Sequence, residues 1–178
     1  MRDVSYQYLN SDEAAAELPS LLHVLSGCVA EGASVGFISI DPQPMKRFWQ
    51  GVVASLTDGD KQLLVARHHG RIVGTVILVL GMMPNGEHRA EIAKLLVHPE
   101  ARRQGIAREL LRQAERRAAE AGKTLLVLDT RSGDVAEQLY LREGWQISGR
   151  IPDFALSTSG ELEGTTVMYK MAGGQAVR

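Results

Sequence analysis

The sequence predicts an α/β (α+β) fold, in which a mixed, mostly antiparallel central sheet carries helices on both faces. Two patterns predict it. Before residue 57 and over residues 106–120, apolar residues recur every three or four positions, as in helices with one buried face. Over residues 61–97 and after residue 123, apolar runs of strand length alternate with turns. At 178 residues, 44% hydrophobic and 23% charged, we expect one domain over residues 1–178.

The first 97 residues predict helices followed by a three-stranded meander. Leucines and valines at helical spacing predict a helix over residues 11–31, which Pro19 divides because proline fits the first turn of a helix. Asp41 and Pro42 predict the cap and first turn of another helix. Three successive antiparallel strands, joined by tight turns, are then predicted over residues 62–69, 71–83 and 89–97.

The second half of the chain predicts alternating helices and strands. A helix of about four turns follows Pro99 and ends at Gly122. The apolar run from Thr124 to Asp129 predicts a central strand that is covered on both faces. The remaining elements are a short helix over residues 134–143 and strands over residues 145–151 and 165–171, the last at the sheet edge or next to it.

Charge and hydropathy argue against several partners. The net charge of −1 supplies no overall attraction to nucleic acid or anionic membranes. The most apolar stretch, residues 72–83, is shorter than the roughly 20 residues needed to cross a bilayer. With a single cysteine, Cys28, and no apolar leader segment, we expect a cytoplasmic protein. The five histidines form no ligand-like cluster, so no metal site is predicted.

The loop before the four-turn helix has the features of an anion-binding site. Over residues 97–111, an apolar strand leads into a loop that opens directly into a helix, whose first turn offers unpaired N–H groups and a positive dipole end. Gly105 allows close approach of a phosphate, and Arg102, Arg103 and Arg108 add positive charge. The residues of a dinucleotide-binding turn and of a P-loop are both missing, so we expect a different phosphate-bearing ligand.

Two segments resemble motifs of the GNAT acetyltransferase superfamily. RRQGIA, residues 102–107, resembles its cofactor-binding loop, and YLREGW, residues 140–145, resembles its tyrosine-then-glycine-aromatic signature. More narrowly, GASVGF, PNG, RAEIAKLLVHP and LDTRSGDVAE are similar to the tabtoxin-resistance acetyltransferase group. The resemblance implies the GNAT fold and transfer of an acetyl group from acetyl-CoA to the amine of a small molecule.

The resemblance also implies where acetyl-CoA binds. In the superfamily, the strands ending at Val97 and at Asp129 diverge and the pantetheine arm lies in the opening, where it pairs with the backbone of Leu95, Leu96 and Val97. The pyrophosphate is expected at the loop and the helix start, which comprise Arg102, Arg103, Gln104, Gly105, Ile106, Ala107 and Arg108.

An acceptor amine arrives mostly as an ammonium ion, so a base must deprotonate it before it attacks a thioester. Glu91 and Asp129 match acidic residues assigned to catalysis in the tabtoxin-resistance group, and Tyr140 matches the tyrosine that can protonate the departing thiolate. By strand alternation, Glu91 shares one face with Ala93, Leu95 and Val97. The plainer alternatives are that Glu91 is a solvated or ion-paired strand carboxylate, that Asp129 caps the end of its strand and that Tyr140 is a core residue.

We therefore expect direct transfer in a ternary complex, with Cys28 as a packing residue and not a nucleophile. The tabtoxin-resistance group suggests an amino-acid-like toxin or antibiotic as acceptor. A protein or peptide N-acetyltransferase and a non-catalytic acyl-CoA-binding module are the alternatives. The GASVGF segment, residues 32–37, forms either the lip of an acceptor pocket or a tight connection, and the chain is a monomer or a homodimer.

Overall fold

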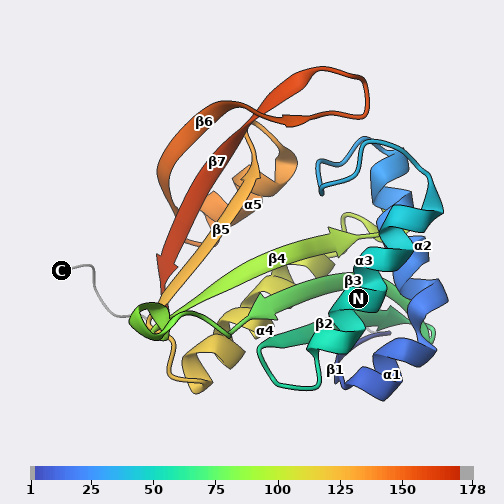
Figure 1. Ribbon diagram of the computed structural model, residues 1–178, viewed down its shortest axis with the longest axis horizontal. Coiled ribbons are helices and arrows are strands. Elements are labelled where there is room, and N and C mark those ends of the chain that lie inside the picture. The colour runs from blue at the N-terminus through green and yellow to red at the C-terminus, as the bar shows by residue number, and fades with distance from the viewer. Residues whose placement is uncertain (1–2, 173–178) are drawn as a thin grey trace.

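The computed structural model describes residues 3–172, which form a seven-stranded sheet with helices on both faces (Figure 1). The strands are β1 (Val4–Leu9), β2 (Lys61–His68), β3 (Arg71–Val79), β4 (Arg89–Val97), β5 (Leu125–Arg131), β6 (Gln146–Leu156) and β7 (Leu162–Met171). The α-helices are α1 (Ser11–Ala16), α2 (Leu18–Ala30), α3 (Pro42–Ser55), α4 (Ile106–Glu120) and α5 (Val135–Arg142). The strand order is β1-β2-β3-β4-β5-β7-β6, and within the described residues β4 and β5 alone pair in parallel. The predicted fold class is confirmed.

Local signals in the sequence set the helix boundaries. Pro19 lies in the first turn of α2, as expected, and the short helix α1 begins with a capping box between Asn10 and Glu13. Asp41 caps α3 by accepting a hydrogen bond from a backbone N–H of its first turn at 3.1 Å, and Asp134 caps α5 in the same way. None of the helices within residues 3–172 has the length and apolar character needed to span a membrane.

Strand β1 was not predicted. It runs antiparallel to β2, and its residues alternate between partly buried Val4, Tyr6 and Tyr8 and exposed Ser5 and Gln7. This alternation was present in the sequence, but the segment is short and half of it is polar. The consequence for the fold is that β1, and not β2, forms one edge of the sheet.

The two faces of the sheet are covered to different extents. Helices α4 and α5 lie on one face, over a core that includes Leu126 and Leu128 of β5. Helices α1, α2 and α3 lie on the other face, over β2, β3 and β4, around the fully buried Trp49. On that second face no described helix covers β5, whose Val127 and Asp129 line an open cavity. The expectation that β5 is covered on both faces was therefore wrong.

The parallel pairing of β4 with β5 is short. It joins Arg89 to Leu125, Ala90 to Leu126 and Glu91 to Val127, and beyond these pairs the strands run apart (Figure 1). Strand β5 continues beside β7, which separates it from the edge strand β6. Of the two places expected for the last strand, the structure shows the penultimate one. The divergence leaves a wedge in the middle of the sheet.

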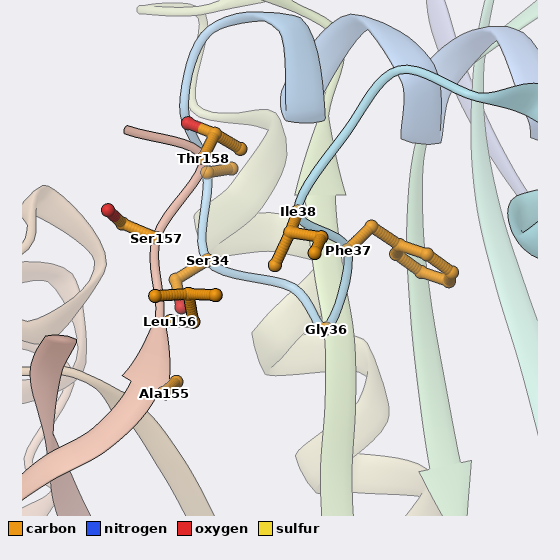
Figure 2. A pocket seen from close by; sticks show the side chains of 9 residues that line it. Ser34, Gly36, Phe37, Ile38, Ala155, Leu156, Ser157 and Thr158 are labelled. Atoms are coloured by element: carbon orange, nitrogen blue, oxygen red, sulfur yellow. The ribbon is translucent and has the colours of Figure 1, made fainter. Parts of the chain in front are cut away.

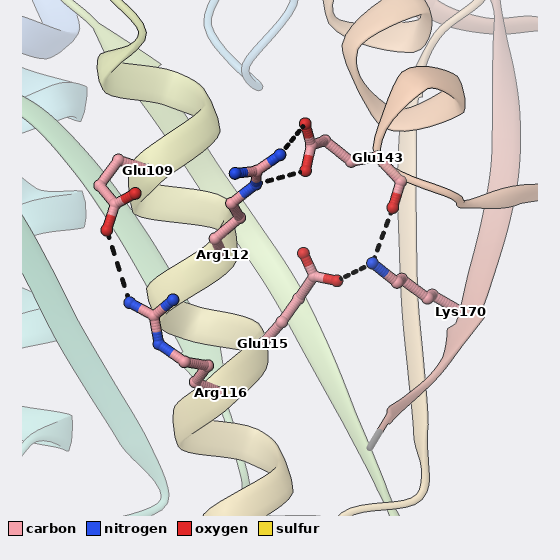
Figure 3. A network of polar contacts seen from close by, with 6 residues as sticks. All are labelled: Glu109, Arg112, Glu115, Arg116, Glu143 and Lys170. Carbon is pink, nitrogen blue, oxygen red and sulfur yellow. Dashed lines mark hydrogen bonds and ion pairs between the residues drawn. The ribbon is translucent and has the colours of Figure 1, made fainter. Parts of the chain in front are cut away.

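A polar network joins the two halves of the sheet on the α4 side of the wedge (Figure 3). Arg112 of α4 donates two hydrogen bonds to the carboxylate of Glu143, at 2.8 and 3.2 Å. Glu115 of α4 pairs with Lys170 of β7, whose Nζ also donates to the Glu143 carbonyl oxygen at 2.7 Å. Because only three residue pairs connect β4 to β5 within the described chain, these contacts help to hold α4 at a fixed distance from α5 and β7.

Candidate active site

The loop before α4 presents a set of free backbone donors. Arg103 and Gly105 have positive φ angles of 63° and 76°, and Gly105 is the N-cap of α4 without offering a side-chain cap. The first N–H of this region with a partner is that of Glu109, which donates to the Gly105 carbonyl oxygen at 3.1 Å. The N–H groups of residues 103–108 therefore make no hydrogen bond within the described chain, and together with the helix dipole they favour an anion.

The side chains around this loop add to its positive character. Arg102, Arg103 and Arg108 are exposed, and none forms an ion pair with any of residues 3–172. Gln104 has a buried carbonyl oxygen without a hydrogen-bond partner in the same part of the chain. The loop thus combines unpaired donors with unneutralised charge, as a diphosphate requires.

A β-bulge changes which side chains face the wedge. Lys94 has φ 50°, and the register between β3 and β4 shifts opposite it, between Thr75 and Ile77. The side that faces α2 and α3 holds Ala93 before the bulge and Leu96 after it. The side that faces α4 holds Ile92, Leu95 and Val97. The expectation that Glu91 shares a face with Leu95 and Val97 was wrong, because the extra residue reverses the alternation beyond Ala93.

The backbone of the last β4 residues remains open to the wedge. The strand pairs with β3 on one side, whereas its pairing with β5 stops at Glu91, so residues 92–97 have no strand partner on that side within the described chain. Cys28 approaches from α2 and its thiol donates to the Val97 carbonyl oxygen at 3.4 Å. Burial raises the pKa of this thiol, which suits a packing residue better than a nucleophile.

Glu91 and Asp129 come together at the mouth of the wedge. Both line a cavity of about 270 Å³, whose other lining residues are Val127, Leu128, Ile151, Phe154, Thr165 and Val167. Burial and the charge of Asp129 raise the pKa of Glu91 above its ordinary value. Asp129 accepts a hydrogen bond from the Thr165 hydroxyl at 3.0 Å, and neither carboxylate has an ion-pair partner among residues 3–172. Asp129 does not end its strand, since β5 continues to Arg131.

Tyr140 lies on the opposite face of the sheet from the two carboxylates. Its side chain, 6% exposed, belongs to the core under α4 and packs at 5.8 Å from the ring of Trp145. Burial, followed by the charges of Asp134 and Asp129, raises the pKa of Tyr140 well above its ordinary value, so the hydroxyl stays protonated. Within the described residues this hydroxyl has no hydrogen-bond acceptor, which leaves its proton free for a ligand.

The loop after α2 and the tip of the β6–β7 hairpin form a second pocket (Figure 2). Its volume is about 140 Å³, and it is lined by Ala33, Ser34, Gly36, Phe37, Ile38, Ala155, Leu156, Ser157 and Thr158. Arg131 of β5 fixes the loop by donating to the Gly32 carbonyl oxygen at 2.8 Å. Sequence reasoning identified the loop side of this pocket but missed the hairpin side, along with Phe154 and Thr165 of the larger cavity, because no local signal marks residues that meet only in the fold.

A cluster of two histidines and an aspartate lies near the β1 edge of the sheet. Pairing of β1 with β2 brings Asp3 beside His68 and His69, and their potential ligand atoms lie within 4.8 Å of one another. This group was not predicted from the sequence, because Asp3 is far from His68 and His69 along the chain. Strand β3 lies between β2 and β4, so this cluster takes no part in the wedge.

Comparison with known proteins gives a consistent result. The family model described as the acetyltransferase (GNAT) family matches residues 35–145. The chain is 34% identical over 103 residues to the aminoalkylphosphonate N-acetyltransferase of Salmonella typhimurium, covering 57% of this chain and 67% of that protein. It is 32% identical over 95 residues to an uncharacterized N-acetyltransferase of Mycobacterium tuberculosis, covering 53% of this chain and 58% of that protein.

A solved structure shows the same fold. The phosphinothricin acetyltransferase from Sinorhizobium meliloti, in complex with AcCoA, superposes with a TM-score of 0.79 at 18% identity, covering 99% of this chain and 92% of the other. At this identity the likeness concerns the fold.

Proposed function

Because the chain belongs to the GNAT acetyltransferase family, we propose that it transfers an acetyl group from acetyl-CoA to the amino group of a small molecule, by direct attack in a ternary complex. The observation that carries this proposal is the wedge, which has free anion-binding donors at one end and two unpaired carboxylates at its mouth. We propose further that residues 1–178 act as one domain, since a single sheet contains strands from Val4 to Met171.

The residues around the wedge fit acetyl-CoA. The N–H groups of residues 103–108 and the side chains of Arg102, Arg103 and Arg108 would hold its pyrophosphate. The unpaired edge of Leu95, Leu96 and Val97 offers backbone groups to its amides, as an added strand would. When bound, this co-substrate supplies the acetyl thioester.

Glu91 and Asp129 prepare the amine. Two carboxylates on one cavity attract an ammonium ion, and the raised pKa of Glu91 makes it a stronger proton acceptor than an ordinary glutamate. Asp129 is oriented by Thr165, which fixes one of its oxygens. We assign Glu91 the removal of the proton, directly or through water, and Asp129 the binding of the cationic form.

Tyr140 acts on the departing thiolate. A thiol has a pKa of about 8.5, which is below that of a buried tyrosine, so complete proton transfer from Tyr140 is unfavourable. A hydrogen bond from the protonated hydroxyl to the developing negative charge is favourable, and no described residue competes for it. We therefore propose that Tyr140 stabilises the leaving group chiefly as a hydrogen-bond donor.

A small acceptor is favoured by the size of the site. A cavity of about 270 Å³ is near the lower end of the range of small-molecule sites. The Salmonella relative is named for aminoalkylphosphonates and the Sinorhizobium structure for phosphinothricin. These names support a small amine as the acceptor of this protein. The finer resemblance to the tabtoxin-resistance group suggests an amino-acid-like toxin or antibiotic.

The test combines binding with turnover. Titration calorimetry with acetyl-CoA measures cofactor binding, and a thiol-release assay over small amines, peptides and proteins measures transfer. We expect acetyl-CoA to bind and small amines to release CoA faster than peptides do. Preference for peptide N-termini would identify a protein N-acetyltransferase, and binding without any transfer would identify a non-catalytic acyl-CoA-binding module.

A further inference from the structure

Lys94 brings a positive charge to the same face of the sheet as the two carboxylates. The bulge in β4 turns its side chain toward α3, where Nζ lies 5.2 Å from the centre of the Phe48 ring. The hydroxyl of Thr75, itself fully buried, donates to the Lys94 carbonyl oxygen at 2.9 Å and fixes the bulge. In a regular strand this side chain would point to the α4 side instead. The bulge therefore places the charge beside the wedge.

The ammonium group of Lys94 is partly buried and unpaired. Its Nζ has no carboxylate within 4.0 Å and no hydrogen-bond acceptor among residues 3–172. Burial lowers the pKa of this lysine, while Asp129 and Glu91 oppose that shift, so the three charges interact without touching. Charges withdrawn from water are costly unless they are paired. Within the described chain, each of the three groups thus lacks an oppositely charged partner, which a ligand can provide.

Gly36 leaves space beside this ammonium group. A Cβ added at Gly36 would lie 3.9 Å from Lys94 Nζ, and Gly36 has φ 96°, which disfavours any larger residue there. Gly36 also lines the pocket shown in Figure 2, together with Ser34 and Leu156. Lys94 is therefore next to the loop that borders this pocket and within electrostatic range of Glu91 and Asp129.

We propose that Lys94 binds an acidic group, a carboxylate or a phosphonate, on the same small molecule whose amine is acetylated. The inference rests on the proposed function and narrows its substrates to amines that also carry an acid. The ammonium group of such a molecule faces Glu91 and Asp129 while its acid faces Lys94, so one zwitterion satisfies all three charges. An amine with a neutral tail leaves Lys94 desolvated and unpaired, and the site discriminates against it for that reason.

The test compares acceptors that differ only in the acid, such as β-alanine and β-alaninamide, with 2-aminoethylphosphonate as a second acid. For Lys94→Met we expect kcat/KM to fall at least about tenfold for the two acids, mainly through KM, and to change less than about threefold for the amide. Lys46→Met is the matched control, because Lys46 is exposed on α3 and outside the site. Each acceptor is compared with itself between variants, so its own amine pKa cancels.

Melting temperature and acetyl-CoA affinity report on the fold of each variant. If methionine is not tolerated at φ 50°, Lys94→Asn serves instead, since asparagine adopts this backbone region more readily. Equal losses for the acids and the amide would assign Lys94 a structural role and overturn the inference. So would wild-type protein that acetylates β-alaninamide as well as β-alanine when each kcat/KM is expressed per concentration of unprotonated amine. Wild-type protein that binds acetyl-CoA and acetylates no amine would overturn the proposed function itself. This outcome is measured without any Lys94 variant, so it is distinct from failure of the inference about Lys94.

Discussion

Replacing Gly105 by valine is expected to weaken acetyl-CoA binding far more than it destabilises the fold. Gly105 has φ 76°, and this backbone region costs an L-residue roughly 1–2 kcal/mol. Space is not the constraint, because the nearest atom to an added Cβ is Arg108 Nη2 at 3.7 Å. The free energy of unfolding should therefore fall by about 2 kcal/mol at most.

The loss of affinity is larger because relief of the strain rotates the peptide groups around residue 105. A hydrogen bond to a charged group contributes about 1.5–3 kcal/mol. Loss of two of the donors in residues 103–108 removes about 3–6 kcal/mol, which raises Kd on the order of 10²- to 10⁴-fold. Titration calorimetry measures the affinity, and urea unfolding measures the stability.

Gly122→Val is the matched control for this experiment. Gly122 has φ 82°, an added Cβ meets no atom within 4 Å, and the residue follows the opposite end of α4. Its valine variant carries the same backbone strain without affecting the donors of the loop. If the two variants bind acetyl-CoA equally well, the loop is not the phosphate site and the reasoning is refuted.

Three further predictions concern the proton-transfer groups and the network of Figure 3. Glu91→Gln should lower turnover on the order of 10²-fold or more with unchanged acetyl-CoA affinity, and wild-type kcat/KM should rise with pH through the raised pKa of Glu91; wild-type rates in the variant would place the base elsewhere. Tyr140→Phe should slow turnover about tenfold while urea unfolding stays unchanged, since no described hydrogen bond is lost; a large stability loss would indicate a structural role. Lys170→Met leaves Glu115 buried without its partner, so unfolding free energy at pH 8 should fall by about 2 kcal/mol, less than for a fully buried pair. Burial raises the pKa of Glu115, so this loss should shrink on acidification to pH 4, where most of Glu115 is protonated in the folded protein; an equal loss at both pH values would contradict the assignment.

The elements with strong local signals were predicted correctly from the sequence. The proline after Asp41 marked the start of α3, and β4 was predicted with the bounds that the structure shows. The bulge at Lys94 was missed because one extra residue in an apolar strand leaves no trace in composition or period. It also invalidated the face assignment beyond Ala93, whereas Glu91 precedes the bulge and lines the same cavity as Asp129.

Tertiary arrangement explains the remaining differences. A continuous apolar run such as that of β5 indicates burial, but it does not say whether a helix or a cavity lies against each face. Asp129 became a candidate through the resemblance to the tabtoxin-resistance group and its place after such a run, whereas Thr165 and Phe154 reach the cavity from a hairpin more than twenty residues later in the chain. Lys94 lies in the RAEIAKLLVHP segment, yet its position on the same face of the sheet as the carboxylates depends on the bulge.

The brief ladder between β4 and β5 makes ligand occupancy part of the architecture of this protein. Each strand leaves the other after three residues, so the main chain on both borders of the opening must exchange hydrogen bonds with solvent or with whatever enters. A molecule that bridged the opening would act as a missing strand, and without it the two halves of the sheet are joined by these residue pairs and by the network of Figure 3. Binding of acetyl-CoA should therefore also stabilise the sheet, because the ligand would bond these same few peptide groups.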